Sequence, residues 1–329
     1  MKLKSIAAVL LSTLLAVSSQ GVAAKTYKLA SNVPADSATG KLLQEFAQNV
    51  TDQTEKRVRI RVFANGTLGG QAQYLQQIQS GVVDMGLVNS AMMENIEPKF
   101  GVLNLPFIFR DFEEFKTVMN SDLVQDKLFK TTQTKGFEVV GFMDTGPRSI
   151  YSTKPVNSIE DLKGLKLRSM SSPTYIEMLT LMGASPTPLD FTEIYSAMQQ
   201  GMIDGGEGGL GTLWDIKFGE YAKYGILTEQ TRMVDLIIIN ERSFNKMSPE
   251  DVATVKRLMN ETSERSLEVI VADAEASMAL AEKNLGVKFV EIDKQPLIDS
   301  MKPIYERTFA DPDKGPFLKE MFELQERSL

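Results

Sequence analysis

The chain has 329 residues, 43% of them hydrophobic and 24% charged, which is typical of a soluble globular protein with about two domains. Its formal net charge of −7 argues against nucleic-acid binding, because surfaces that bind phosphates need clustered lysine and arginine. The sequence contains neither cysteine nor histidine, which removes disulfides, thiolates, the commonest metal ligand and the usual general base. We therefore expect no enzymatic activity and no catalytic residue, metal site or cofactor.

The chain begins with the features of an export signal. Two lysines precede the apolar run Ile6 to Val17, and small residues follow as far as Ala24. A membrane anchor is less favoured, because about 20 uninterrupted apolar residues are needed to span a bilayer and this run is shorter. We predict a signal peptide over residues 1–24 and a mature protein in the periplasm.

Residues 27–88 alternate between the patterns of strands and helices. TYKLASN predicts a strand, and the stretch 41–54 predicts a helix whose apolar residues share one face. RVRIRVF alternates strictly and predicts a second strand. A glycine-rich turn, a helix through Ile78 and the strand VVDMGLV follow. This order predicts a largely parallel sheet.

The segment from residue 164 repeats the same plan. GLKLRSM, ASPTPLD and MIDGG predict strands, and helices are predicted between them. The phrase SGVVDMG of the first copy matches QGMIDGG of the second, and Gly81 and Gly201 stand where helices end. Asp84 and Asp204, in the matching phrases, are interpreted as residues that fix the turns. The repeat predicts an α/β fold with two lobes, each built on a mainly parallel sheet flanked by helices.

The remainder of the chain predicts connections between the lobes. RMVDLIIINERSF indicates a buried strand that returns toward the first lobe, and a long helix runs from the N-cap Ser248 to Gly286. At 1.5 Å per residue, that helix can span both lobes. The tail predicts short helices on the second lobe. We assign residues 25–145 and 234–273 to lobe I, and residues 146–233 and 274–329 to lobe II.

A ligand cleft is expected between the lobes. In open parallel sheets, ligands bind beyond the carboxyl ends of the strands. The residues just after the predicted strands should therefore line the cleft, and these are Asn32, Asn89, Arg168 and the segment 207–209. Arginine suits carboxylate binding because its planar guanidinium offers two parallel donors and stays charged.

Several motifs in one order resemble the solute-binding proteins of tripartite ATP-independent periplasmic (TRAP) transporters. They are GLKLR, the segment GASPTP, the helix TEIYSAMQQG and the turn DGGE, accompanied by LGGQAQYLQQIQSGVVDM, LPFIF and the export signal. The likeness covers essentially the whole mature chain. It implies a monomeric, two-lobed fold of the periplasmic-binding-protein type II kind that closes on an organic acid. It also implies delivery of that acid to the membrane subunits of an ion-driven TRAP permease.

The resemblance also implies roles for particular residues. Arg168, in GLKLR, would pair with the ligand carboxylate, and Arg148, in GPRSIYS, is the matching second arginine. The two could share one carboxylate or take different acidic groups, and an ion pair is the alternative for Arg148. Phe191 would cover the carbon skeleton of the ligand, with ordinary core packing as its alternative. The matching polar positions of the first lobe are Asn32, Gln71 and Asn89.

One position departs from the family pattern, and three more have two readings. Family members often carry asparagine where this chain has Gly208, so a donor is missing and space is gained. Glu207 either contacts the ligand or fixes its turn, and we favour the turn. Asp36, beside Ser37, either belongs to the N-cap of the first helix or binds ligand hydroxyls. Trp214 is either a packing anchor or a contact, and packing is favoured.

We expect a sugar acid or hydroxy acid as the ligand, because the polar side chains of the first lobe could bind hydroxyl groups. A C4-dicarboxylate comes next, since two arginines suit two carboxylates. Two other functions stay open: a secreted hydrolase, which would have to work without histidine or a Gly-x-Ser-x-Gly elbow, and a ligand-sensing partner of a signalling receptor.

Overall fold

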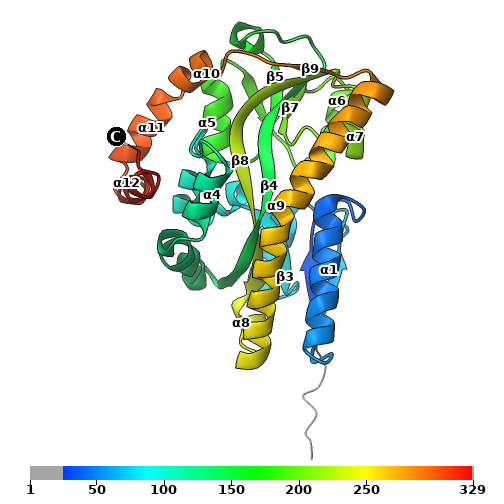
Figure 1. The fold of residues 1–329 in the computed structure, drawn as a ribbon, viewed down its shortest axis with the longest axis vertical. Coiled ribbons are helices and arrows are strands. Elements are labelled where there is room, and N and C mark those ends of the chain that lie inside the picture. The colour runs from blue at the N-terminus through cyan, green and yellow to red at the C-terminus, as the bar shows by residue number, and fades with distance from the viewer. Residues whose placement is uncertain (1–24, 328–329) are drawn as a thin grey trace, which may run out of the picture.

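The computed structural model describes residues 25–327, so the predicted signal peptide lies outside the described residues. In that part of the chain, nine strands form one mixed sheet (Figure 1). Its order is β2-β1-β3-β8-β4-β7-β5-β6, and β9 pairs with β8. The strands are β1 (Lys25–Ala30), β2 (Val58–Phe63), β3 (Met85–Asn89), β4 (Phe137–Ser152), β5 (Lys166–Ser169), β6 (Ser185–Pro188), β7 (Gly205–Gly208), β8 (Tyr224–Asn240) and β9 (Lys288–Val290).

Two long strands, β4 and β8, join the two ends of the sheet. They pair antiparallel with each other, and β8 also pairs antiparallel with β3 and β4 with β7. The outer pairs β1-β2, β1-β3, β5-β6 and β5-β7 are parallel, as expected where helices connect successive strands. The predicted α/β fold with flanking helices is confirmed, and β4 and β8 join the two expected sheets into one.

The repeated phrase of the sequence corresponds to a repeated contact at the start of β3 and β7. Asp84 accepts a hydrogen bond of 3.0 Å from the backbone N–H of Lys28, in the segment KLAS. Asp204 accepts one of the same length from the backbone N–H of Lys166, in the segment KLRS. Each aspartate therefore ties its turn to the neighbouring strand, which confirms the structural role predicted for both.

Helices cover the sheet, and among residues 25–327 none is long and apolar enough to cross a membrane. The α-helices are α1 (Ala38–Gln53), α2 (Gln71–Ser80), α3 (Ser90–Met93), α4 (Phe112–Met119), α5 (Pro173–Leu181), α6 (Ile194–Gln199), α7 (Thr212–Asp215), α8 (Glu241–Phe244), α9 (Pro249–Leu285), α10 (Gln295–Ser300), α11 (Lys302–Ala310) and α12 (Gly315–Leu324). The 3-10 helices are η1 (Pro98–Asn104), η3 (Phe129–Lys135), η4 (Ile159–Leu162), η5 (Phe191–Glu193) and η6 (Phe218–Glu220), and η2 (Leu123–Leu128) is a π-helix.

The long helix α9 begins and ends where the sequence predicts. The Ser248 side chain accepts a hydrogen bond of 3.1 Å from the backbone N–H of Asp251, which caps the first turn. Gly286 ends the helix with a left-handed backbone, φ 66°. The helix packs on α1, β4 and α7, and Figure 1 shows it running past α1 toward α7. It therefore contacts elements at both ends of the sheet.

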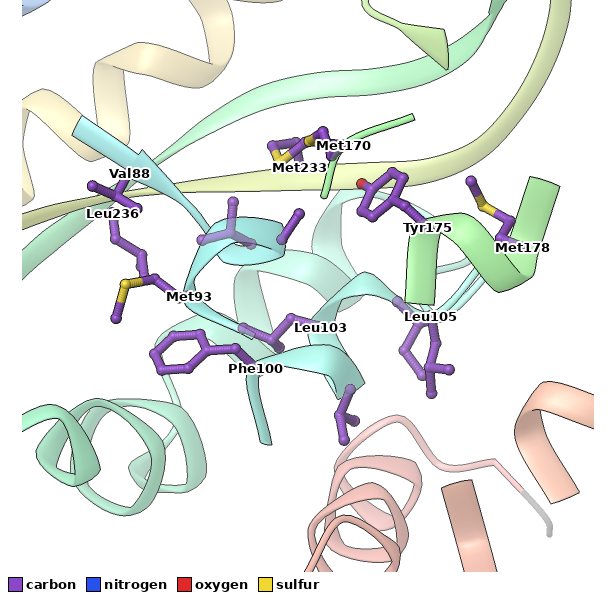
Figure 2. Packing of buried hydrophobic residues seen from close by; sticks show 14 of the residues in the cluster. Val88, Met93, Phe100, Leu103, Leu105, Met170, Tyr175, Met178, Met233 and Leu236 are labelled. Atoms are coloured by element: carbon purple, nitrogen blue, oxygen red, sulfur yellow. The ribbon is translucent and has the colours of Figure 1, made fainter. Parts of the chain in front are cut away.

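Hydrophobic cores lie on both faces of the sheet. On the face that α1 and α9 cover, Phe46 and Met259 pack with residues of β1, β3 and β8. On the other face, Figure 2 shows Val88 of β3 and Leu236 of β8 near Phe100 of η1, in a cluster that extends to α5. A single core thus connects elements from both copies of the repeat.

The C-terminal helices contact more than the second lobe. The Tyr305 hydroxyl of α11 donates a hydrogen bond of 2.8 Å to the carbonyl oxygen of Pro106. After α12, the Gln325 side chain donates one of 2.8 Å to the carbonyl oxygen of Ile108. Both acceptors belong to the segment predicted to lie in lobe I. The tail therefore bridges the predicted lobes instead of resting on the second one alone.

The boundaries predicted between the lobes fall within continuous strands and one continuous helix. The boundaries, after residues 145, 233 and 273, fall inside β4, β8 and α9 respectively. At the first of them β4 is irregular, because its register with β8 shifts between Asp144 and Pro147. Gly146, at this shift, has a φ of 77°, a conformation that favours glycine. The division itself remains a prediction.

Candidate functional site

A cavity of about 260 Å³ lies at the carboxyl ends of β1, β3, β5 and β7. The middle parts of β4 and β8 contribute to its lining, and so does α9. The cavity is slightly smaller than the roughly 300 to 1,000 Å³ of sites for drug-sized ligands. Its position agrees with the expectation for the ends of parallel strands.

Most of the predicted site residues line this cavity. The residues in its lining are Asn32, Gln71, Asn89, Arg148, Arg168 and Phe191. The remaining predicted residues lie beside or outside the lining, and these are Asp36, Glu207, Gly208 and Trp214.

Arg168 reaches the cavity from β5 with most of its donors available. Its side chain is only 5% exposed, and its Nε donates a hydrogen bond of 2.9 Å to the carbonyl oxygen of Leu189. Its Nη1 lies 3.8 Å from the Glu207 carboxylate, beyond hydrogen-bond distance. Burial lowers the pKa of Arg168, and Glu207 offsets part of this effect. A guanidinium nevertheless stays charged in proteins. It is thus held by one bond and can present its terminal N–H groups to a ligand.

Arg148, on β4, is bound to Glu207 of β7. Its Nε donates to one carboxylate oxygen at 2.8 Å, and one Nη donates to the other at 3.0 Å. The same Nη also donates to the backbone carbonyl of Glu207 at 3.0 Å. Burial lowers the pKa of Arg148, but the Glu207 carboxylate and nearby tyrosines more than offset this, so its net pKa is raised. Much of this guanidinium is therefore already engaged in an ion pair.

Two polar residues of the predicted lobe I are hydrogen-bonded to each other at the cavity. The side-chain oxygen of Asn89 accepts a hydrogen bond of 2.8 Å from the backbone N–H of Met92 and so caps α3. The side-chain oxygen of Gln71 accepts a bond of 3.4 Å from the backbone N–H of Asn89. In both side chains the oxygen is engaged, so the amide NH₂ groups are the parts available as donors.

Asp190 connects the side of the cavity formed by the first copy of the repeat with the side formed by the second copy. Its carboxylate accepts hydrogen bonds from the backbone N–H of Thr192 at 3.0 Å and from the backbone N–H of Gln71 at 3.1 Å. A Cβ on Gly70 would lie 2.4 Å from that carboxylate, so glycine permits this close approach. The contact holds the start of α2 against the segment that follows β6.

Two of the predicted contacts are directed elsewhere. Asp36 is exposed outside the cavity, and its neighbour Ser37 caps α1 by accepting a bond of 3.1 Å from the N–H of Gly40. The Trp214 ring packs against the core of the second half, with the Lys217 ammonium 3.4 Å from its centre. This packing agrees with the role favoured for Trp214, which stays a prediction. The capping role at the start of α1 belongs to Ser37.

Glu207 and Gly208 act on the cavity through Arg148. The Glu207 side chain is fully buried, is bonded to Arg148 and lies 3.8 Å from Arg168, so it orients Arg148 instead of lining the space itself. A Cβ added at Gly208 would lie 3.6 Å from an Nη of Arg148 and 3.5 Å from the Tyr151 ring, which are ordinary contact distances. The site thus has room for a side chain at Gly208, directed toward Arg148.

We expect Gly208→Asn to leave the fold intact and to change ligand preference. The new amide meets no steric conflict at its Cβ and adds a donor beside the arginine pair. Gly208 is buried, but an added Cβ would meet only ordinary contacts, so we expect a stability cost of no more than about 1 kcal/mol and a shift of the thermal midpoint without ligand by no more than about 3 °C. Calorimetric titration with several sugar acids checks this, and an unchanged order of affinities would remove Gly208 from the determinants of specificity.

Sequence reasoning missed the most unusual side chain of the cavity, Asp235. It lies on β8, lines the cavity and is 7% exposed. Burial raises its pKa to about 7, with Arg148 lowering it and Asp144 raising it. A single charged residue inside the apolar run MVDLIIIN was the signal in the sequence, since buried strands rarely carry an aspartate without a purpose.

Two methionines also line the cavity without having been predicted. Met170 follows β5 and Met233 lies on β8, and Figure 2 shows their side chains next to each other. They come from positions far apart in the sequence, and both also belong to the core that extends to α5. Together with Phe191 they provide an apolar wall against which the carbon skeleton of a ligand can pack.

The model of the family DctP, bacterial extracellular solute-binding protein family 7, matches residues 29–311. This chain belongs to that family. The uncharacterised protein YiiZ from Salmonella typhimurium is 34% identical over 265 residues, 80% of this chain and 81% of that protein. The 2,3-diketo-L-gulonate-binding periplasmic protein of Escherichia coli is 27% identical over 319 residues, 96% of this chain and 91% of its own.

Solved structures of TRAP solute-binding proteins share the fold. One from Anaerococcus prevotii, with bound D-glucuronate, has a TM-score of 0.87 and 29% identity, covering 92% of this chain and 98% of that one. DctP-type proteins are periplasmic receptors that bind small carboxylates and work with membrane permease subunits. The resemblance stated from the sequence is therefore confirmed.

Proposed function

We propose that this protein is a periplasmic receptor for a sugar acid, which it delivers to a TRAP permease. The observation that carries the proposal is Arg168, a buried guanidinium that lines the cavity and whose terminal N–H groups are free to donate. Such a group binds a carboxylate with two parallel, charge-assisted hydrogen bonds. Relatives whose names or structures report a ligand bind 2,3-diketo-L-gulonate and D-glucuronate, which supports a sugar acid.

The rest of the cavity supports a hydroxylated ligand. The amide groups of Asn32, Gln71 and Asn89 can donate to hydroxyl oxygens, and Asp190 and Asp235 can accept from hydroxyl groups. Phe191 offers a partly buried ring for the apolar face of a sugar. Donors, acceptors and an apolar wall around one cation fit a sugar ring that carries a carboxylate.

A panel of organic acids tests the ligand class by thermal unfolding. A true ligand at about a hundred times its Kd stabilises the folded protein by about 2.7 kcal/mol, because only the folded form binds it. We expect hexuronates and aldonates to raise the midpoint by several degrees and neutral hexoses to leave it unchanged. If no acid of the panel raises the midpoint, the proposed function is wrong.

Binding should also close the protein around the ligand. The irregular register of β4 at Asp144 to Pro147 supports a hinged motion of the two predicted lobes. Small-angle scattering with and without ligand measures this. A smaller radius of gyration with ligand is expected, whereas equal radii would mean that the cavity is preformed. The same data test whether the protein is a monomer.

Delivery to a permease has its own test. The family works with membrane subunits, so we expect uptake of labelled sugar acid by reconstituted permease to need this protein and an ion gradient. Uptake that proceeds equally well without it would support a sensing role instead.

A further inference from the structure

We infer that Asp235 makes the cavity selective for acids with a single carboxylate and that it takes up a proton when such an acid binds. The inference rests on the proposed function and narrows its ligand class. It concerns a residue that no motif of the family pattern above includes, and it separates the sugar acids from the dicarboxylates that the two arginines first suggested.

Glu207 offsets one of the two positive charges that the arginines bring to the cavity. Two guanidinium groups reach the cavity, Arg148 and Arg168, and one buried carboxylate, Glu207, contacts both of them. Glu207 is bonded to Arg148 through both carboxylate oxygens, so these two charges offset each other. The positive charge of Arg168 remains. It is matched by one ligand carboxylate, and a second carboxylate would find no free cation in this group.

Asp235 lies at the cavity without a hydrogen-bond donor from the described residues. It faces the cavity from β8, paired in register with Asn89 of β3 and Met143 of β4. Among the residues that the structure describes, none donates a hydrogen bond to its carboxyl group. A buried carboxylate without donors is costly, so the group either keeps a proton or binds a donor from the ligand. A ligand hydroxyl satisfies it in both states, and a second carboxylate cannot do so when Asp235 is ionised.

Several ionisable groups surround Asp235. Arg148 of β4 attracts its charge, and Asp144 of β4 repels it. Asp144 is itself bonded to Arg232 at 2.7 Å, and burial keeps the Tyr74 hydroxyl of α2 neutral. The other ionisable groups that share the cavity or bind its arginines are Arg168 of β5, Glu207 of β7, Asp190 before η5, Asp215 of α7 and Asp273 of α9.

The balance of these groups gives the sign of the pH dependence. Burial places the pKa of Asp235 at about 7 in the free protein. A ligand carboxylate brings a further negative charge into the cavity and raises that pKa. The bound form therefore holds more protons than the free form. Affinity is full below pH 7 and falls as the pH rises above it.

Titration calorimetry with D-glucuronate, which has one carboxylate, and D-glucarate, which has two, tests the inference. For D-glucuronate we expect the affinity to fall about tenfold between pH 6 and pH 8, as follows from one group with a pKa of about 7. Titrations in two buffers of different ionisation enthalpy should show uptake of about half a proton at pH 7 and close to one at pH 8. D-glucarate should bind at least tenfold more weakly than D-glucuronate at pH 8.

The variant Asp235→Asn removes the titrating group while keeping its size. We expect its affinity for D-glucuronate to be independent of pH between 6 and 8, and its discrimination against D-glucarate to shrink. Asp313→Asn is the matched control, because it makes the same change at an exposed position outside the cavity lining, and it should behave like wild type. The proton count on wild type needs no variant, so the test survives a failure of Asp235→Asn to fold.

The outcomes separate this inference from the proposed function. If no sugar acid binds at any pH between 5.5 and 8.5, both are wrong. If D-glucuronate binds without proton uptake, or if D-glucarate binds as tightly as D-glucuronate at pH 8, the inference is wrong and the proposed function stands.

Discussion

Replacing Arg168 by alanine is expected to weaken sugar-acid binding by roughly ten- to a thousandfold or more, the largest effect on affinity that we predict. A hydrogen bond to a charged group contributes about 1.5 to 3 kcal/mol, and Arg168 can give one or two of them to the ligand carboxylate. Arg148 cannot easily take over this role, because both oxygens of Glu207 already bind it.

Arg168→Lys separates geometry from charge. Lysine keeps the positive charge but lacks the planar fork, and it also loses the bond from Nε to the Leu189 carbonyl that aims the group. We expect it to bind nearly as weakly as the alanine variant. Arg59→Ala, at an exposed position on β2, is the control and should bind like wild type.

The stability of the Arg168 variants without ligand should change little. The side chain is buried, so the lost bond to Leu189 costs stability, while removing a buried cation returns part of that cost. Calorimetric titration of all variants decides the matter. Affinities within a factor of three of wild type would show that the carboxylate is held elsewhere, with Arg148 the first alternative.

Glu207→Ala is expected to cause the largest loss of folding stability, about 3 to 5 kcal/mol. Removing one partner of a buried ion pair leaves the other charge without compensation. Here the stranded group is Arg148, which donates to both carboxylate oxygens of Glu207, and the Glu207 side chain is fully buried. Urea unfolding without ligand measures the free energy.

Two further variants test the mechanism of this loss. The double variant Arg148→Met/Glu207→Ala should be more stable than Glu207→Ala alone, because no unpaired charge remains in the core. Glu261→Ala is the matched control, since Glu261 pairs with Arg257 at the surface and exposed pairs contribute about 0 to 1 kcal/mol. A loss below about 1 kcal/mol for Glu207→Ala would contradict the view that this pair stabilises the fold.

Much of the local structure follows from the sequence. Ser248 and Gly286 delimit α9 because a capping hydroxyl and a left-handed glycine act on the neighbouring backbone alone. The matching phrases around Asp84 and Asp204 predict a repeated turn, and both aspartates make the same contact with a strand. The position of Arg168 at the end of a strand places it at the cavity, since parallel strands direct their carboxyl ends to one edge.

Only the tertiary structure decided how the charges of the cavity are paired. The sequence offers two arginines and two carboxylates, Glu207 and Asp235, and nothing local says which ones meet. Arg148 pairs with Glu207 because β4 and β7 lie side by side although 59 residues separate the two. Asp235 stays unpaired because the long strand β8 carries it into the cavity between β3 and β4. Strand pairing over such distances depends on the whole fold, and the energy of a charge depends on what that pairing places beside it.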